Sequence, residues 1–271
     1  MKKIVSFFLL LSFSLLLFSS CSRGEEKKER GYEENRGYQY LMEQENGEAL
    51  TAAYEKFEKG IREYKKTIFL LDFSHPITTE EMDIVYDCVW ADFPEFFWIP
   101  RSFDSQTFDN YLLSLSPNYE IEKEEAEGMR EKMEEKVEEV MRTVEGMKEE
   151  EKEKYIHDFL VNSISFSYPE ESKMANTVYG ALVEGKANCM GYSFAFLYLM
   201  REIGVPGFIC FGEAGGGEHA WNIVQVDGEF LHVDTTWADL EEISYQYYNV
   251  TTEEISKDHK IEEIVYGYPE L

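Results

Sequence analysis

The sequence predicts an α+β fold in which a buried helix packs against an antiparallel sheet. The first observation is the run 189–200, which is apolar on nearly every face and stops before Gly204, as a buried helix does. The second is Asp227-Gly228, a strong two-residue turn signal between two β-rich runs. The third is a pair of Glu- and Lys-rich segments over 121–162 whose apolar residues recur at helical spacing.

Length and charge limit the class of protein. The chain has 271 residues, of which 44% are hydrophobic, so it can bury a sizeable core. Its 54 acidic residues against 26 basic ones give a formal net charge of −28, and such a field repels phosphate backbones. We therefore expect no nucleic-acid partner.

The first residues carry an export signal. Lys2 and Lys3 precede an apolar run over 4–18, and two small residues separate that run from Cys21. The run is shorter than the ~20 residues that cross a bilayer, so a transmembrane helix is the weaker alternative. The position of Cys21 resembles the lipobox of bacterial lipoproteins, in which this Cys is lipidated. Phe18 stands three residues before Cys21, where the lipobox usually has an aliphatic residue, so secretion of a soluble form is a further, weaker alternative. We expect 1–20 to be a lipoprotein signal peptide and the exported chain to be held at the bacterial membrane or envelope through Cys21.

Residues 21–48 are expected to form a disordered tether. Almost no aliphatic side chain occurs among the Glu, Lys, Asn and Gln residues after Cys21, so the segment cannot bury a core. A flexible chain of this length would reach roughly 30 Å. The folded part would then lie near the membrane surface without resting on it.

Residues 49–120 predict a small α+β unit without catalytic chemistry. Apolar residues recur at helical spacing from Leu50, and Thr78 with Glu81 three residues later is a capping box. The aromatic residues of this unit are expected in its core rather than in a ligand cage. The predicted elements are helices over 50–64 and 78–89 and strands over 68–73, 96–99 and 111–115.

An amphipathic helix pair is predicted next, over 121–144 and from Gly146 to about Asn162. The Met and Val stripe of the first helix is expected to pack inward, with partner binding through its Met face as the alternative. On the second helix we expect His157 to be a satisfied structural histidine. Together with the core that follows, these helices make up the domain predicted over 121–271.

Cys189 is the candidate nucleophile because of its place at the start of the buried helix. Asn188 before it is a good N-cap, and the positive end of the helix dipole favours a thiolate over a thiol. The alternative is a structural cysteine, since free Cys is often buried. Cys88 and Cys210 fit that alternative, and a disulfide between two of these three cysteines stays open.

The predicted hairpin brings a histidine and a carboxylate onto one sheet face. With a two-residue turn, Val226 pairs with Glu229, and Trp221 then lies opposite Asp234. His219 is two residues from Trp221 and therefore diagonal to Asp234, where long side chains can meet. A thiolate, a base and an orienting acid on successive elements are the parts of a Cys-His-Asp triad.

Three further features of this region have competing interpretations. His232 shares the face of Asp234, but its neighbour across the hairpin is Ile223. We therefore expect His219 rather than His232 to be the base. No third spaced ligand accompanies these side chains, and we expect no metal. The glycines 215–217 predict a mobile approach to His219, with a plain loop as the alternative.

Three sequence blocks resemble those of the transglutaminase-like superfamily. They are Cys189-Met190-Gly191-Tyr192, His219-Ala220-Trp221 and Val233-Asp234-Thr235-Thr236-Trp237, and the resemblance covers about 150–250. The chain looks most like bacterial exported lipoproteins that bear this domain. The resemblance implies a papain-like core with Cys189 as nucleophile, His219 as base and Asp234 as the residue that orients the base. It implies no cofactor, because the calcium-loop pattern of the animal enzymes is not visible.

The implied chemistry is acyl transfer through a thioester on Cys189, with a protein or peptide as substrate. Water as the second attacking group would make a peptidase or deamidase, and an amine would make a cross-linking transglutaminase. The superfamily also includes proteins that have lost activity, so the alternative is an inactive cell-envelope binding or scaffolding protein.

Overall fold

The structure, a computed structural model, describes residues 35–72 and 74–264. The predicted signal peptide, Cys21 and much of the predicted tether lie outside these residues. All the described residues belong to one compact unit of the chain. None of their helices is both long and apolar enough to cross a bilayer.

The first described elements are three helices and a three-stranded antiparallel sheet. The helices are α1 (Arg36–Met42), α2 (Gly47–Arg62) and α3 (Thr79–Asp92), and the strands are β1 (Ile68–Phe69), β2 (Phe103–Phe108) and β3 (Tyr111–Pro117), in the order β1-β3-β2. The predicted capping box is present at α3. Glu81 N donates to Thr78 Oγ1 at 3.2 Å, and Thr78 N donates to the Glu81 carboxylate at 2.7 Å. Both predicted helices and the strand from Tyr111 are confirmed, whereas β1 is shorter than expected and β2 was not predicted.

The prediction of a tether up to residue 48 is wrong over its C-terminal part, which contains α1 and the start of α2. Gly37 and Leu41 are buried despite the polar sequence around them. The reason is a long-range contact: the buried Asp92 carboxylate accepts hydrogen bonds from Gly37 N and Tyr38 N, both at 3.1 Å. A Cβ at residue 37 would lie 2.5 Å from Asp92 Oδ2, so this close approach requires glycine.

The predicted strand over 96–99 is also wrong. Phe96 N donates to Phe93 O and Ile99 N donates to Phe96 O, both at 2.9 Å, so the backbone follows consecutive turns. Phe96, Phe97 and Trp98 are all buried. Successive side chains of a strand point to opposite faces, and turns allow these three to enter one core. The expectation that the aromatic residues here belong to the core is confirmed.

Helices α4 (Lys123–Val144) and α5 (Glu149–Ser163) confirm the predicted amphipathic pair. Met133, Val137 and Val140 of α4 are buried, so its apolar stripe packs inward and is not exposed to a partner. His157 on α5 is buried as well, with Nδ1 2.9 Å from Asp158 Oδ1. Its Nε2 has no hydrogen-bond partner among the described residues, so the expectation of a satisfied histidine holds for one ring nitrogen only.

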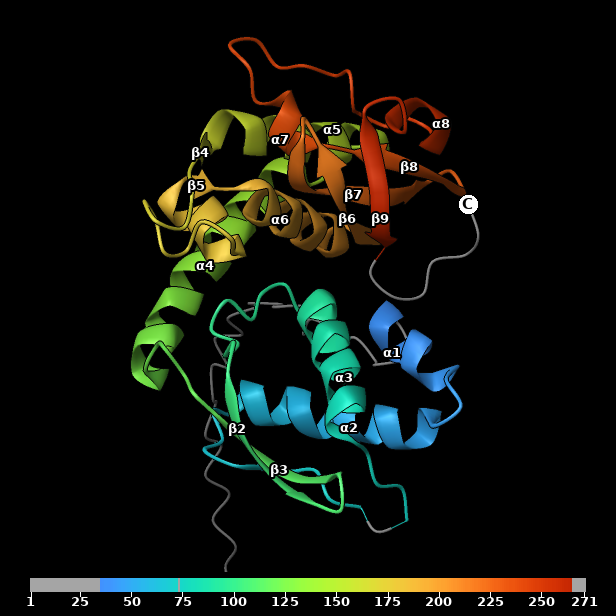
Figure 1. The fold of residues 1–271 in the computed structure, drawn as a ribbon. Helices are drawn as coiled ribbons and strands as arrows, with labels where there is room; N and C mark the ends of the chain where they lie inside the picture. Colours follow the sequence, from blue (N-terminus) through green and yellow to red (C-terminus); the bar gives the residue numbers. More distant parts are fainter. Residues whose placement is uncertain (1–34, 73, 265–271) are drawn as a thin grey trace, which may run out of the picture. The chain divides into compact units, whose positions relative to one another are not determined.

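The C-terminal part of the chain centres on a four-stranded antiparallel sheet. Its strands are β6 (Gly207–Ala214), β7 (Gly217–Val226), β8 (Glu229–Val233) and β9 (His259–Ile264), in the order β8-β7-β6-β9. Helix α6 (Cys189–Glu202) packs against β6 and β7, which gives the predicted buried helix on an antiparallel sheet (Figure 1). The predicted register is confirmed, since Val226 pairs with Glu229 and Ile223 pairs with His232.

The glycines 215–217 form the turn between β6 and β7. Gly217 begins β7 and pairs with Ala214 of β6. Gly215 and Gly216 are the two turn residues, with φ of 62° and 85°, a conformation that suits a two-residue hairpin turn and favours glycine. The strand that carries His219 is therefore entered through a defined turn.

Short elements connect these parts. They are β4 (Ser165–Phe166) and β5 (Lys186–Ala187), which pair in parallel, the π-helical turn η2 (Gly180–Glu184), α7 (Thr235–Ala238) and α8 (Thr252–Ile255). Strand β5 leads into α6, and β8 leads into α7. Cys189 and Asp234 thus lie at boundaries between elements, where side chains can project from the edge of the core.

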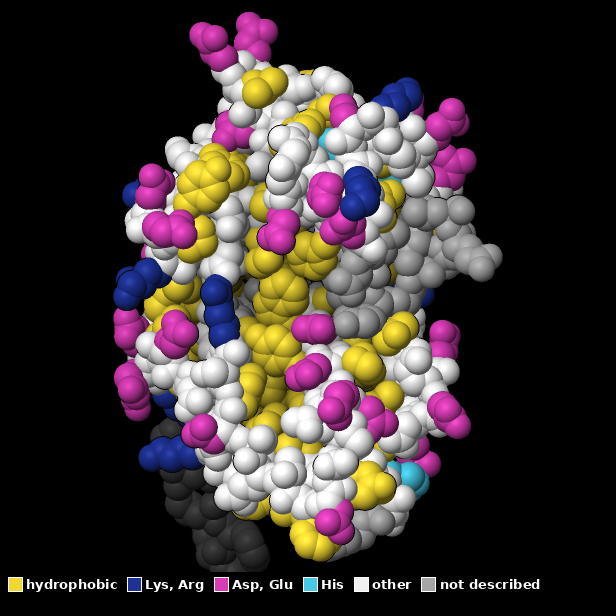
Figure 2. All heavy atoms as spheres, viewed as in Figure 1, with side chains coloured by type: hydrophobic (Ala, Val, Ile, Leu, Met, Phe, Trp, Pro, Cys, Tyr) yellow, Lys and Arg dark blue, Asp and Glu magenta, His cyan; other side chains and the backbone are white. Residues whose placement is uncertain are grey.

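The negative charge is distributed over the surface. On the face drawn in Figure 2, acidic side chains are spread over many elements and are not gathered in one patch. Some form exposed pairs along α4, such as Arg130 with Glu134, and pairs of this kind contribute little stability.

Candidate active site

Cys189 is the first residue of α6 and is held there by contacts with the preceding chain. Asn188 caps the helix as predicted, its Oδ1 accepting from Gly191 N at 3.1 Å. Asn188 N in turn donates to Ala175 O at 2.8 Å. A Cβ at Gly191 would come 2.3 Å from the same carbonyl oxygen, so this turn of the helix requires glycine. The thiol of Cys189 is half-buried at the helix N-terminus, where the dipole favours negative charge.

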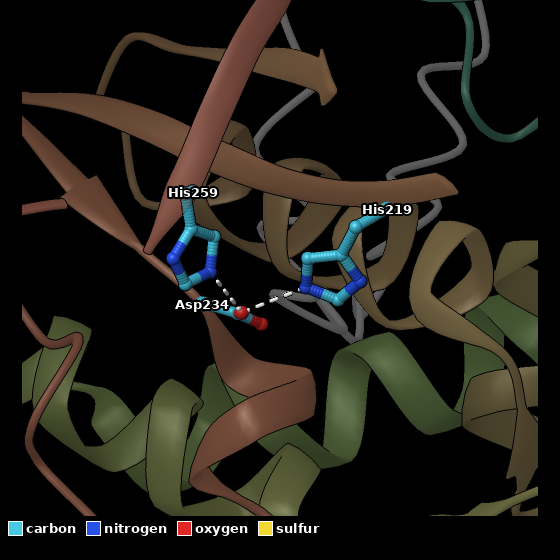
Figure 3. A group of neighbouring side chains, drawn as sticks. All are labelled: His219, Asp234 and His259. Atoms are coloured by element: carbon cyan, nitrogen blue, oxygen red, sulfur yellow. Dashed lines mark hydrogen bonds and ion pairs between the residues drawn. The ribbon is translucent and has the colours of Figure 1, made fainter. Parts of the chain in front are cut away.

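The hairpin brings His219 and Asp234 together. His219 Nε2 lies 2.8 Å from Asp234 Oδ2, and both side chains are buried (Figure 3). Asp234 follows β8 and caps α7, where its Oδ1 accepts from Thr236 N at 2.9 Å and from Trp237 N at 3.1 Å. These two backbone hydrogen bonds fix the carboxylate so that Oδ2 faces the imidazole.

The imidazole of His219 lies between two acidic groups. Asp234 lies at Nε2, and Cys189 is close enough to the ring to affect its pKa, so Nδ1 is the nitrogen left for the sulfur. Burial by itself would lower the pKa of His219, but hydrogen bonds and charge from Asp234 and Cys189 raise it to about 9. Burial would likewise raise the pKa of Asp234, yet hydrogen bonds from His219 and His259 hold it below its usual range. Near pH 7 the site favours an imidazolium beside an ionised Asp234.

A second histidine, His259, contacts the same carboxylate, and the sequence analysis missed it. Its Nε2 lies 3.2 Å from Asp234 Oδ2, and its Nδ1 lies 2.7 Å from Asp258 Oδ1 (Figure 3 shows the contact with Asp234). His259 begins β9, which pairs with β6 through Ala214 and has no local turn linking the two strands. The sequence over 259–264 gives no strand signal, because its apolar residues, Ile261 and Ile264, are three positions apart and do not alternate with polar ones.

The buried group of His219, Asp234 and His259 could hold a metal ion, because one ligand atom from each lies within 4.8 Å of the others. The expectation of no metal depends on the lack of a third candidate side chain, and the structure adds His259 to the group. Both imidazoles already direct Nε2 at one carboxylate oxygen within hydrogen-bond distance. Direct hydrogen bonds therefore account for this geometry by themselves.

His232 contacts groups other than Asp234. Its Nδ1 accepts from Trp221 Nε1 at 2.9 Å, and its Nε2 lies 3.1 Å from Thr252 Oγ1. Burial, and then the charge of His259, lower the pKa of His232 to about 4, so its ring is neutral near pH 7. Of the two histidines on this hairpin, it is His219 that reaches the carboxylate, as the register predicts.

The other two described cysteines are structural. Cys88 and Cys210 are fully buried, and burial raises the pKa of both thiols well above its usual range. All three cysteines in the described part of the chain are free, so no disulfide joins Cys189 to either. Cys189 is the accessible thiol of the three.

One family model matches the central segment of the chain. Residues 135–235 match the family model of the transglutaminase-like superfamily, and Cys189, His219 and Asp234 all fall within the matched range. The match confirms the resemblance drawn from the three sequence blocks. A comparison with curated protein sequences gives no significant match.

Three solved structures show partial similarity. A TGase aligns with a TM-score of 0.37 and 12% identity, over 57% of this chain and 48% of its own. A candidate cysteine protease from Cytophaga hutchinsonii aligns with a TM-score of 0.34 and 10% identity, over 51% of this chain and 62% of its own. A candidate protease from Parabacteroides distasonis aligns with a TM-score of 0.31 and 12% identity, over 48% and 35%. This chain spans about half the length of the first of these structures.

Proposed function

We propose that this chain, whose residues 135–235 form a transglutaminase-like domain, is an exported, lipid-anchored enzyme that transfers acyl groups through Cys189. The observation that carries the proposal is His219, whose imidazole hydrogen-bonds to Asp234 and has Cys189 close enough to affect its pKa. A thiol, a base and an orienting acid aligned in this way can act as one catalytic unit. The acyl donor would be an amide of a protein or peptide.

The first half-reaction would form a thioester. The sulfur of Cys189 attacks the carbonyl carbon of the amide, and the C–N bond breaks as His219 gives its Nδ1 proton to the leaving amine. Backbone N–H groups at the start of α6 are suited to stabilise the negative charge that develops on the carbonyl oxygen. Asp234 keeps the ring of His219 in the orientation that this transfer requires.

The second half-reaction would release the acyl group. The neutral His219 takes a proton from water or from an amine as that group attacks the thioester carbon, and the C–S bond breaks. The thiolate of Cys189 and the imidazolium of His219 are then restored. Water yields a free acid, which defines a peptidase or deamidase, and an amine yields a new amide, which defines a cross-linking transglutaminase.

The test measures thiol reactivity and turnover separately in the full chain. Iodoacetamide at pH 6 should alkylate Cys189, as located by peptide mass spectrometry, while Cys88 and Cys210 serve as buried internal controls. Glutamine-containing peptides supplied with a dansylated primary amine then report acyl transfer to the amine as incorporated fluorescence and hydrolysis as free acid. Cys189→Ser should abolish both products.

An unreactive Cys189, together with no Cys189-dependent product across a broad screen of peptides and amines, would overturn the enzyme assignment. The cell-envelope binding or scaffolding protein would then be the better description.

A further inference from the structure

We propose that His259 is a positioning residue of this site: an imidazolium held between Asp258 and Asp234 that limits how strongly Asp234 holds the proton on His219. The inference deepens the proposed function and rests on it. It gives a role to strand β9, which lies outside the residues that match the family.

Both ring nitrogens of His259 face carboxylate oxygens. Nε2 lies 3.2 Å from Asp234 Oδ2, and Nδ1 lies 2.7 Å from Asp258 Oδ1. An ionised carboxylate only accepts hydrogen bonds, so each nitrogen has to supply a proton. A neutral imidazole has a single N–H and can satisfy one of the two carboxylates. With both carboxylates ionised, His259 carries both ring protons and a positive charge.

Aromatic rings surround His259, which is itself buried. The ring centroids of Trp237, Tyr247 and Trp221 lie 4.7, 4.9 and 5.1 Å from that of His259. Tyr247 Oη also donates to Asp258 Oδ2 at 2.6 Å, and this hydrogen bond, followed by that of His259, holds the pKa of Asp258 below its usual range. The outer carboxylate therefore stays ionised near pH 7.

Two other histidines face His259. The ring centroid of His219 lies 5.7 Å away, and His232 is near enough for the charge of His259 to lower its pKa further after burial has done so. Since His232 is neutral near pH 7, the charged groups around His259 there are Asp234, Asp258 and the imidazolium of His219.

The charge of His259 affects His219 through the carboxylate that they share. Both imidazoles use Asp234 Oδ2, so the negative charge of Asp234 is divided between them. Without His259, Asp234 would hold the proton on His219 more tightly. His219 would then release that proton less readily to a leaving amine and would act less readily as a base in the second half-reaction. His259 thus lowers the basicity of His219, so that its ring can both give up a proton in the first half-reaction and take one in the second.

The test is an NMR titration of the full chain labelled with ¹⁵N-histidine. The chain has five histidines, so single substitutions assign the ring signals. In the native chain at pH 7, the ring of His259 should show two N–H protons. His259→Gln leaves a neutral amide donor near Asp234 and removes the charge, so the titration midpoint of His219 should rise by about one to two pH units.

His232→Gln is the matched control. It replaces a buried, neutral histidine beside Trp221 and should leave the midpoint of His219 unchanged. One proton on the native ring of His259 would overturn the inference, and so would an unchanged midpoint in folded His259→Gln. If His259→Gln does not fold, Asp258→Asn is the second test, because the side chain of Asp258 is exposed and its replacement should leave the fold intact. Removing this anion should weaken the two-proton signal of His259 at pH 7, and an unaltered signal would overturn the inference.

This readout does not depend on turnover. A raised midpoint of His219 together with an unreactive Cys189 would contradict the proposed function and leave the charge of His259 established. A reactive Cys189 with an unchanged midpoint would support the proposed function and overturn the role of His259.

Discussion

Replacing Asp234 by asparagine perturbs the site sharply, because the change removes one charge and keeps the shape. Asp234 accepts four hydrogen bonds, two at Oδ1 from Thr236 N and Trp237 N, and two at Oδ2 from His219 and His259. An asparagine offers a single acceptor oxygen, so one side of the group must present N–H to donors. The backbone N–H groups cannot change, and the oxygen therefore stays with them. The amide nitrogen then faces the two imidazoles.

The consequence for His219 is the wrong tautomer. Because Nε2 of His219 then faces an N–H, it has to accept a hydrogen bond, and the single proton of the neutral ring moves to Nδ1. Nδ1 is the nitrogen that faces Cys189, so in this tautomer it cannot take a proton from the thiol or from an attacking group. Asp234 and Cys189 together raise the pKa of His219 from 6.5 to about 9, which corresponds to about 3 kcal/mol of imidazolium stabilisation, and the share that comes from Asp234 is also lost. We expect turnover to fall about 10⁴-fold, the size seen when the Asp of a Ser-His-Asp triad becomes Asn.

The assay is the rate of alkylation of Cys189 from pH 5 to pH 9, with circular dichroism to verify the fold. The raised pKa of His219 keeps its imidazolium up to about pH 9, so native Cys189 should react at mildly acidic pH. In Asp234→Asn the rate at pH 6 should fall about a hundredfold and recover only at alkaline pH. Equal rates at pH 6 in the two folded proteins would refute the role given to Asp234.

Three other predictions use different measurements. Cys189→Ala and His219→Ala should each abolish turnover, and the double variant should be hardly worse than either, because members of one catalytic unit are not additive. Losses that add in the double variant would show that the two residues act independently. Cys21→Ser should release the chain from the membrane fraction, and an unchanged partition would contradict the lipid anchor. Glu153 is buried, and burial above all raises its pKa from 4.5 to about 7, so stability is lost as the pH rises from 4.5 through 7. Glu153→Gln should therefore raise the free energy of unfolding by up to about 3 kcal/mol at pH 8 and by little at pH 4.5, measured by urea unfolding; an equal gain at both pH values would indicate packing instead of charge.

The part of the site that could be predicted is the part fixed by local chain geometry. His219 and Asp234 belong to two strands joined by one two-residue turn, so counting outward from Asp227-Gly228 gives their relation. The environment of Cys189 is local as well, because its cap is the preceding residue.

Contacts between distant segments could not be predicted in this way. β9 pairs with β6 across a long stretch of chain, and nothing near His259 in the sequence indicates which strand it joins. The same holds for α1. Its polar sequence is typical of a tether, and the distant Asp92, which accepts hydrogen bonds from the first N–H groups of the helix, cannot be identified from the local sequence.

Tyr192 joins the start of α6 to the segment that follows α7. Its buried hydroxyl lies 2.7 Å from Asp239 Oδ2 and 3.1 Å from Ile164 O. The buried hydroxyl of Tyr192 therefore connects helix α6, which begins with Cys189, to the segment that follows α7. Widening the site by separating these two elements would break that tie. Substitutions that widen the site would therefore be tolerated best in segments outside this tie.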